Sequence, residues 1–261
     1  MKVNVLENYE ALCDAVGDII IDKVAQCHSP LVCFASGDTS LGILKILTQA
    51  HREEQVNFGN TRFAGLDEWV GINRSDAGSC RHTLNRHFFL PLGIARSRIQ
   101  FFDGKSQDLQ AECARMNDYL EQYGPLDFIL LGVGLNGHIG FNEPTGSLAS
   151  RTWVKILSEQ TIKDNAIYFE DPEEVPRHVV TMGIATVMET RHCLLLANGA
   201  KKADAVRRMI EGPVSASCPA SILQMHKRVT IVLDEEAAYL LTFKDHYKWV
   251  EGNKLDWQKY D

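Results

Sequence analysis

A run of apolar residues at positions 126–133, Leu-Asp-Phe-Ile-Leu-Leu-Gly-Val, constrains the fold of this chain more than any other feature. A short run of this kind, bounded by glycine, is typical of a strand that is buried on both faces of a sheet. It passes into a glycine-rich loop, 134–144, in which a histidine and a carboxylate stand five residues apart. Open α/β sheets bind their ligands at the carboxyl ends of strands, so the segment predicts a buried strand with a site at its end.

Strand-like and helix-like segments alternate along most of the chain. Strands are predicted at 31–35, 61–66, 126–133, 193–197 and 229–233, and helices at 39–52, 81–90, 107–123, 200–211 and 235–241. Only one strand and one helix have room before residue 31. Strands that alternate with helices of 10–15 residues imply crossover connections and a mainly parallel sheet. We therefore predict an α/β fold, and the lack of a Gly/Ser-rich linker favours a single domain.

The last 18 residues, 244–261, are polar with interleaved aromatic side chains. We expect this terminal segment to pack Trp249 and Trp257 onto the domain. A subunit interface or a lid over the site is the alternative interpretation.

Charge and cysteine usage exclude several classes of function. The chain has a formal net charge of −7, which argues against a general nucleic-acid or anionic-membrane surface. Its seven cysteines form no CxxC pair, and their scattered spacing predicts reduced thiols and no metal site. The N-terminus lacks the apolar core of a signal peptide, and no run of 18 apolar residues occurs. These patterns predict a cytoplasmic protein without a membrane partner.

Two glycine-containing segments between a strand and a helix could bind an anion. In the first, Ser36, Gly37 and Thr39 place hydroxyls and a flexible turn beside a predicted helix N-terminus. Such a terminus has a partial positive charge and unpaired N–H groups, which suit a phosphate. In the second, Lys202 lies in the first turn of a predicted helix. An ordinary helix cap and a surface lysine are the alternative interpretations of these segments.

Two other segments could move protons. Asp67 and Glu68 follow an apolar strand, so at least one carboxylate should face the carboxyl edge of the sheet, where it could act as a general base. His138 can gain or lose a proton near neutral pH, and Glu143 could orient it. The alternatives are a solvated turn for the acids and a histidine bonded to loop backbone. One histidine and one carboxylate without further ligands do not make a metal site.

Taken together and in order, these segments resemble the glucosamine-6-phosphate deaminase family, which includes galactosamine-6-phosphate deaminases. The likeness spans roughly residues 1–243. Its most specific parts are Leu-Asp-Glu-Trp-Val-Gly at 66–71, Asn-Gly-His-Ile-Gly-Phe-Asn-Glu-Pro at 136–144 and Ser-Leu-Ala-Ser-Arg-Thr at 147–152, with further matches at 180–183 and 219–226.

The resemblance implies an open, Rossmann-like α/β domain with helices on both faces of the sheet. It also implies an enzyme of the hydrolase class that converts a hexosamine 6-phosphate, of glucosamine or galactosamine type, to a ketose 6-phosphate and ammonia. The reaction would pass through an enediol-type intermediate and need neither a metal nor an organic cofactor. A small-molecule sugar phosphate would be the partner. The family includes monomers and larger assemblies, so a homo-oligomer stays open.

The resemblance also implies a role for each candidate residue. Asp67 matches the base that moves a proton between C2 and C1 of the sugar. His138 matches the residue that assists ring opening, Glu143 the acid that pairs with it, and Asn136 the third member of that group. The phosphate-binding positions are Ser36, Gly37, Asp38, Thr39 and Lys202.

Three departures from the family pattern concern the site itself. Asn136 stands where many members have aspartate, and asparagine cannot take a proton. Asp38 replaces a glycine, and its carboxylate would repel a phosphate unless it turns away or is itself bonded. Ile167 falls where well-studied members have a phosphate-gripping arginine, so a strong anion contact is lost. We therefore hypothesise that the distal group of the substrate is held differently, or is a different group.

A fourth departure concerns regulation. Allosteric members have a basic pair for an effector phosphate after 150–152, whereas this chain has Trp153 at the first of those positions. The sequence therefore predicts no strong activation by N-acetylglucosamine 6-phosphate.

Two competing functions remain. A 6-phosphogluconolactonase would be a related hydrolase, but the Asp67-Glu68 pair and the residues after His138 favour a deaminase. A non-catalytic sugar-phosphate-binding module, such as the effector domain of a regulator, usually follows a DNA-binding helix-turn-helix, for which the chain has no room before residue 31.

Overall fold

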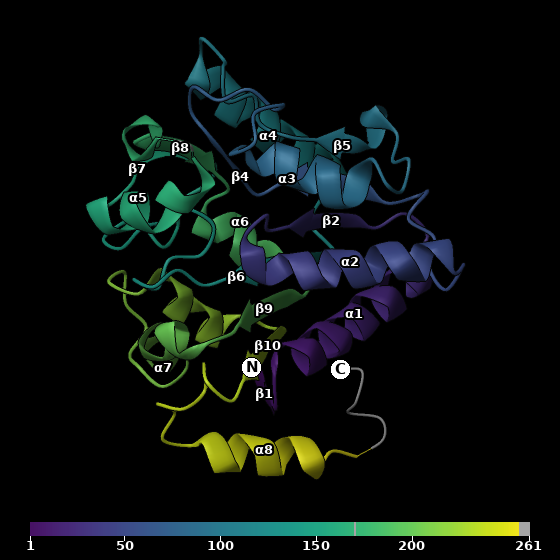
Figure 1. The fold of residues 1–261 in the computed structure, drawn as a ribbon, viewed down its shortest axis with the longest axis vertical. Helices are drawn as coiled ribbons and strands as arrows, with labels where there is room; N and C mark the ends of the chain where they lie inside the picture. Colours follow the sequence, from purple (N-terminus) through teal and green to yellow (C-terminus); the bar gives the residue numbers. More distant parts are fainter. Residues whose placement is uncertain (170, 256–261) are drawn as a thin grey trace.

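The computed structural model describes residues 1–169 and 171–255. Its centre is a seven-stranded sheet in the order β1-β10-β9-β6-β2-β3-β5 (Figure 1). Every neighbouring pair in this sheet is parallel, which confirms the predicted class. The strands are β1 Lys2–Leu6, β2 Leu31–Phe34, β3 Arg62–Gly65, β5 Ile99–Gln100, β6 Phe128–Gly132, β9 Cys193–Ala197 and β10 Val229–Asp234.

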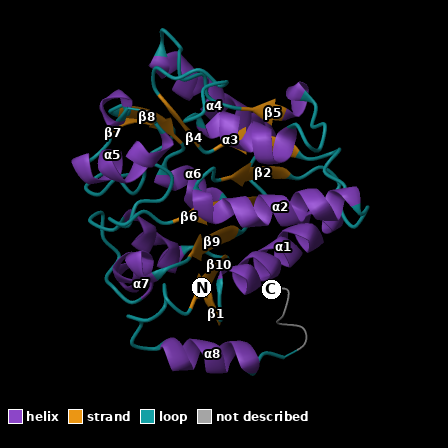
Figure 2. Ribbon diagram, in the orientation of Figure 1, coloured by secondary structure: helices purple, strands orange, loops and turns teal. Residues whose placement is uncertain are grey.

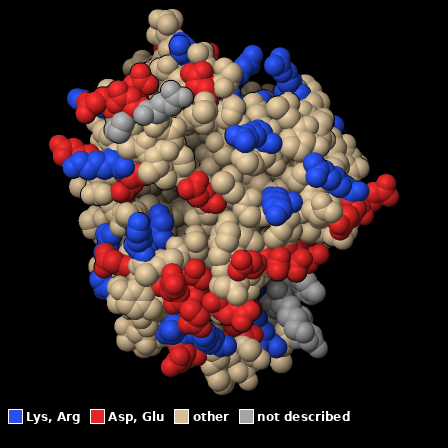
Figure 3. Space-filling view, in the orientation of Figure 1, with Lys and Arg blue, Asp and Glu red and all other residues tan. Residues whose placement is uncertain are grey.

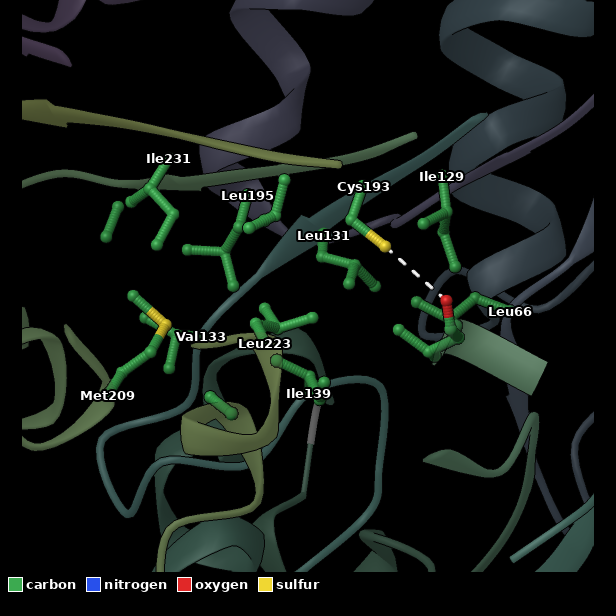
Figure 4. Close-up of a cluster of buried hydrophobic side chains, with 14 of the residues drawn as sticks. Leu66, Ile129, Leu131, Val133, Ile139, Cys193, Leu195, Met209, Leu223 and Ile231 are labelled. Atoms are coloured by element: carbon green, nitrogen blue, oxygen red, sulfur yellow. Dashed lines mark hydrogen bonds between the residues drawn. The ribbon is translucent and has the colours of Figure 1, made fainter. Parts of the chain in front are cut away.

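Helices cover both faces of this sheet (Figures 1 and 2). Along β2, Val32 and Phe34 join one buried cluster, whereas Leu31 and Cys33 join the other, as expected for a strand whose side chains alternate between faces. The first cluster includes residues of α1 Tyr9–Gln26, α2 Asp38–Arg52 and α3 Cys80–Leu84. The second, part of which Figure 4 shows, includes residues of α4 Leu109–Tyr123, α6 Ile184–Glu189 and α7 Ala203–Ile210.

A small antiparallel sheet, in the order β4-β8-β7, stands beside the large one and was not predicted. Its strands are β4 Asp67–Trp69, β7 Trp153–Ile156 and β8 His178–Thr181. The chain passes from β3 into β4 through Leu66, whose carbonyl accepts a hydrogen bond of 2.8 Å from the Met182 N–H. Asp67 therefore lies at the junction of the two sheets.

The predicted helix at 235–241 is wrong, because the chain forms turns over 235–240. The carboxylate of Asp234 accepts hydrogen bonds from the N–H groups of Gly199 and Ala237, at 2.9 and 2.7 Å. These bonds tie the segment to the loop after β9 and favour a turn over helix propagation. The predicted helix at 81–90 is α3 followed by a π-helical turn, Asn85–Phe89.

The terminal segment forms α8 Lys244–Gly252, which lies against the edge strand β1. Trp249 is 63% exposed, so the prediction that it packs onto the domain is wrong. Tyr247 packs against the core instead. Trp257 lies outside the described residues.

The remaining helical elements are short. They are α5 Glu159–Asn165 and the 3₁₀ turns Arg96–Arg98, Ala166–Tyr168, Pro172–Glu174, Ala200–Lys202 and Pro219–Met225. None of the helices in the described part of the chain is long and apolar enough to cross a membrane.

Candidate active site

A cleft of about 900 Å³ opens at the carboxyl edge of the large sheet. Figure 3 shows the hollowed face, with acidic and basic side chains around it. All four segments that the sequence singled out contribute to its lining, from the loops after β2, β3, β6 and β9. A fifth wall, formed by residues 163–165, 167 and 168, was not predicted to line it as a unit.

Asp67 faces this cleft although it is 6% exposed. Burial raises its pKa to about 7, since a desolvated carboxylate favours the neutral form. The thiol of Cys80 lowers the pKa by hydrogen bonding, and the neighbouring Glu68 raises it. Asp67 therefore exchanges its proton close to neutral pH, which a base in proton transfer requires.

Glu68, the next residue, is equally buried but does not line the cleft. Its carboxylate accepts hydrogen bonds from the Ser79 hydroxyl at 2.7 Å and from the N–H groups of Cys80 and Arg81 at 3.1 and 3.0 Å. These donors belong to the start of α3, so Glu68 caps that helix. Of the two predicted acids, Asp67 faces the cleft and Glu68 stabilises the start of α3.

The loop after β6 positions His138 through its glycines. A Cβ at Gly134 would lie 2.1 Å from the His138 ring, so only glycine leaves room for the imidazole. Gly137 has a φ of +89°, which residues with a side chain rarely adopt. The Gly134 N–H donates to the His138 carbonyl at 2.9 Å and closes the loop. The sequence fits this loop because its glycines stand where the ring and the backbone need them.

Asn136 connects His138 to Glu143. Its Nδ2 donates to Glu143 Oε2 at 2.6 Å, while its Oδ1 lies 2.8 Å from His138 Nδ1. An ionised carboxylate can only accept, so the amide nitrogen must face Glu143 and the amide oxygen must face the ring. The ring then has its proton on Nδ1 and a free lone pair on Nε2. Glu143 Oε1 itself lies 3.9 Å from Nδ1, so the asparagine is the main link between the two.

Burial lowers the pKa of His138 to about 4, with Glu143 raising it and Lys202 lowering it. The imidazole is therefore neutral at physiological pH and can accept a proton at Nε2. His138 lines the cleft, whereas Asn136 and Glu143 stand behind it. Of the four predicted catalytic residues, the cleft thus contains Asp67 and His138, and the other two orient the histidine.

The predicted anion site lies in the part of the cleft formed by the loops after β2 and β9 and by residues 163–165, 167 and 168, which we call the distal end. Gly37 is the N-cap of α2 and makes no side-chain capping bond, so the helix starts with unpaired N–H groups beside Ser36 and Thr39. The Thr39 hydroxyl donates to Asn198 at 2.9 Å. Lys202 Nζ donates to the Val133 carbonyl at 2.7 Å, and burial lowers the pKa of this lysine. The structure thus brings all the predicted phosphate residues to one end.

Several lining residues were not predicted as site residues from the sequence. Cys80, Tyr168 and Asn198 all reach the cleft. Tyr168 interacts with Asp38, and burial together with that carboxylate raises the pKa of the phenol. No motif indicates these contacts, because they join segments far apart in sequence. Ile167 lines the cleft as an apolar side chain that is 75% exposed.

Within the described residues, no three His, Cys, Asp or Glu side chains are grouped to hold a metal ion. A Rossmann-like sheet whose carboxyl edge brings together a buried carboxylate, a neutral histidine and an anion site defines a class of enzymes that move protons on small anionic substrates.

Comparison with known proteins narrows this class. Residues 7–232 match the model of the family described as glucosamine-6-phosphate isomerases/6-phosphogluconolactonase, and the chain belongs to this family. It is 44% identical over 249 residues to a glucosamine-6-phosphate deaminase of Streptomyces coelicolor, covering 94% of this chain and 95% of that protein. A glucosamine-6-phosphate deaminase of Corynebacterium kroppenstedtii is 42% identical over 260 residues and matches along the full length of both chains.

Solved structures agree with this assignment. A monomeric glucosamine-6-phosphate deaminase superposes with a TM-score of 0.90 at 39% identity, covering 92% of this chain and all of that one. The 6-phosphogluconolactonase of Trypanosoma brucei gives a TM-score of 0.73 at 19% identity over 92% of this chain and 98% of its own, which shows a shared fold.

Proposed function

We propose that the chain is an amino-sugar phosphate deaminase/isomerase that converts a hexosamine 6-phosphate to a ketose 6-phosphate and ammonia. The observation that supports it most is one cleft in which a carboxylate with a pKa of about 7 and a neutral histidine both face the substrate space. The relatives of 42–44% identity are named for this activity.

Ring opening is the first step. His138 Nε2 takes the proton of the anomeric hydroxyl, the bond between C1 and the ring oxygen breaks, and the proton is returned to that oxygen. Asn136 holds the Nδ1 proton throughout, so the ring accepts only at Nε2. Glu143 fixes the asparagine from behind.

Asp67 then acts on the open chain. It removes the C2 proton, which the adjacent aldehyde makes acidic, while a proton of the C2 ammonium group moves to the aldehyde oxygen, so an enediol-type intermediate with an amino group at C2 forms. Delivery of the proton to C1 leaves an imine at C2. Water adds to this imine and ammonia departs, so one water molecule is consumed, which is the basis for the hydrolase class. Meanwhile Ser36, Gly37, Thr39 and Lys202 hold the phosphate.

The competing lactonase function needs a base for water but no carboxylate beside the C1–C2 bond. Asp67, whose pKa suits repeated proton transfer, favours the deaminase. The decisive assay measures ammonia and ketose phosphate released from glucosamine 6-phosphate and galactosamine 6-phosphate, with 6-phosphogluconolactone as the alternative substrate. Lactone hydrolysis without ammonia release from either amino sugar would refute the proposal.

We further infer a cytoplasmic location, from the seven free cysteines of the chain. One relative of known structure, a glucosamine-6-phosphate deaminase, is monomeric. Sedimentation of this protein would show whether it shares that state or forms a homo-oligomer.

A further inference from the structure

The cleft has an unusual charge balance for one that binds a phosphate. Among the described residues that line the whole cleft, three lysines face four acids; the lysines are Lys163, Lys201 and Lys202, and the acids are Asp38, Asp67, Asp164 and Glu236. A site for a dianion is expected to have an excess of positive charge. This cleft offers the substrate no such excess.

Asp38 concentrates the negative charge at the point where an anion would bind. It is the first residue of α2, beside the unpaired N–H groups of that helix, and it is exposed to the cleft. None of the ion pairs found in the described part of the chain involves Asp38. The helix terminus therefore already has an anion of its own.

The groups that face Asp38 do not cancel its charge. Tyr168, from the 3₁₀ turn after α5, interacts with the carboxylate as a neutral phenol. The Tyr9 hydroxyl, from α1, bonds to the backbone carbonyls of Asp38 and Thr39, at 3.5 and 3.0 Å, and not to the Asp38 carboxylate. On the opposite wall, Lys202 is bonded to the Val133 carbonyl and is influenced by Asp164. Lys163 and Lys201 are exposed, as Asp38 is, and neither forms an ion pair with it in the described part of the chain.

We propose that Asp38 is a specificity-determining residue that makes the distal end of the cleft bind a substrate oxygen which still has its proton. The inference rests on the proposed function and specifies its substrate. The Asp38 carboxylate has no cationic partner among the ion pairs of the described residues, and its two oxygens can accept more bonds than the one from Tyr168. It can therefore accept a hydrogen bond from such an oxygen, and it repels a dianion.

Two substrate groups have this chemistry. A phosphate ester has a second pKa of about 6, so its singly charged form has a P–OH donor and its dianion has none. A free C6 hydroxyl keeps its proton at every pH of interest. If the phosphate ester supplies the proton, binding weakens as the pH rises through about 6. If the C6 hydroxyl supplies it, binding does not need a phosphate on the sugar.

Binding of unreactive sugars separates this inference from the deaminase proposal. Glucose 6-phosphate and glucose lack the amino group, and their dissociation constants can be followed by the fluorescence of Trp69, which lines the cleft. The wild type, Asp38→Asn and Asp67→Asn are compared at pH 5.5 and pH 8. Asp67→Asn is included because Asp67 titrates near 7 in the same cleft. Glu10→Gln, an exposed acid in the first turn of α1, is the matched control.

For the wild type, we expect glucose 6-phosphate to bind about tenfold more weakly at pH 8 than at pH 5.5, the effect of one like charge at short range. Asp38→Asn should remove most of this difference and bind more tightly at pH 8, whereas Asp67→Asn and Glu10→Gln should retain it. If the free hydroxyl is the natural group, glucose binds at least as well as glucose 6-phosphate at pH 8, and Asp38→Asn weakens its binding.

Equal binding of glucose 6-phosphate by the wild type at both pH values, with no tightening in Asp38→Asn, would overturn the inference. Loss of ammonia release with the binding pattern intact would instead count against the proposed function.

Discussion

The two ends of the cleft are built in different ways. At the reaction end, Asp67 and the His138–Asn136–Glu143 group are largely buried. Hydrogen bonds hold the group, and the junction of two sheets holds Asp67. At the distal end, Asp38, Lys163 and Ile167 are exposed side chains on short or terminal helical turns. Groups fixed by the backbone determine which chemistry is feasible, whereas exposed groups can vary without unfolding the wall. The difference suggests that chemistry and substrate choice can be altered separately.

The largest effect should come from Asp67→Asn. The amide keeps the shape of the side chain but cannot accept the C2 proton, so ammonia release should fall by about 10²–10⁴-fold. Binding of the substrate should change little, because Asp67 acts at the reaction end. A coupled assay for ammonia gives kcat and KM separately. A variant that retained more than about a tenth of the wild-type kcat would show that another group is the base.

Glu68→Gln changes the adjacent acid in the same way as Asp67→Asn, but it should lower the stability of the fold and leave kcat largely unchanged. The Glu68 carboxylate accepts bonds from Ser79 and two N–H groups of α3, and an amide has one acceptor oxygen fewer, so the replacement should lower the free energy of unfolding by about 1–3 kcal/mol. Urea denaturation measures that loss. The protein that remains folded should still release ammonia, so a loss of kcat as severe as in Asp67→Asn would remove the distinction between the adjacent acids.

The pH dependence of kcat tests the reaction end as a whole, because kcat at saturating substrate does not contain the pH dependence of binding that is inferred for Asp38. Asp67 must be ionised to act, and its pKa is raised to about 7, so activity should rise with pH and level off above that value. Below it, the rate should fall about tenfold per pH unit, because the ionised fraction does. His138, with a pKa lowered to about 4, stays neutral throughout this range and should add no inflection above pH 5. Rates between pH 5 and 9 in constant ionic strength provide the measurement.

The sequence predicted which residues gather at the cleft better than it predicted the contacts among them, for a physical reason. Some site residues answer local requirements that a sequence pattern can show. Gly134 leaves room for the His138 ring, Gly137 adopts a positive φ, and the acids after β3 stand at the end of a strand. The contact of Tyr168 with Asp38 joins positions 130 residues apart, and no local pattern indicates it. The antiparallel sheet was missed because its strands have only three or four residues. The helix at 235–241 was wrong because Asp234 bonds to a distant loop.

A smaller change is expected when Asn136 is replaced by aspartate. Its carboxylate would face Glu143 at the position where the amide now donates at 2.6 Å, so the two acids would have to share a proton. A carboxylate next to Nδ1 would also raise the pKa of His138 from about 4 toward neutral. Protonated imidazole cannot accept the anomeric proton, so the acid limb should become steeper below the new pKa. At pH 8 the rate should change by less than about tenfold.

Nitrogen NMR of labelled imidazole distinguishes the two arrangements. The wild type should show a proton on Nδ1 and a bare Nε2 from pH 6 to 8, and Asn136→Asp should titrate within that range. Asn136→Leu, which removes both bonds, should populate both tautomers. A wild-type ring protonated on Nε2 would contradict the role assigned to Asn136.

The last prediction is that N-acetylglucosamine 6-phosphate has no effect on the rate, and it concerns Trp153 on β7. Its indole N–H donates to Asn142 at 2.9 Å, next to Glu143, and the Lys155 ammonium lies 4.5 Å from the ring centroid. The strand therefore presents an aromatic ring with one stacked cation where an effector phosphate would need a basic pair. N-acetylglucosamine 6-phosphate should leave the rate curve hyperbolic and the half-saturating substrate concentration unchanged. A sigmoidal curve made hyperbolic by this compound would mean that the wall behind Glu143 can switch between two states. An effector bound outside the cleft would then change the reaction end. This would contradict the interpretation that only the distal end can vary.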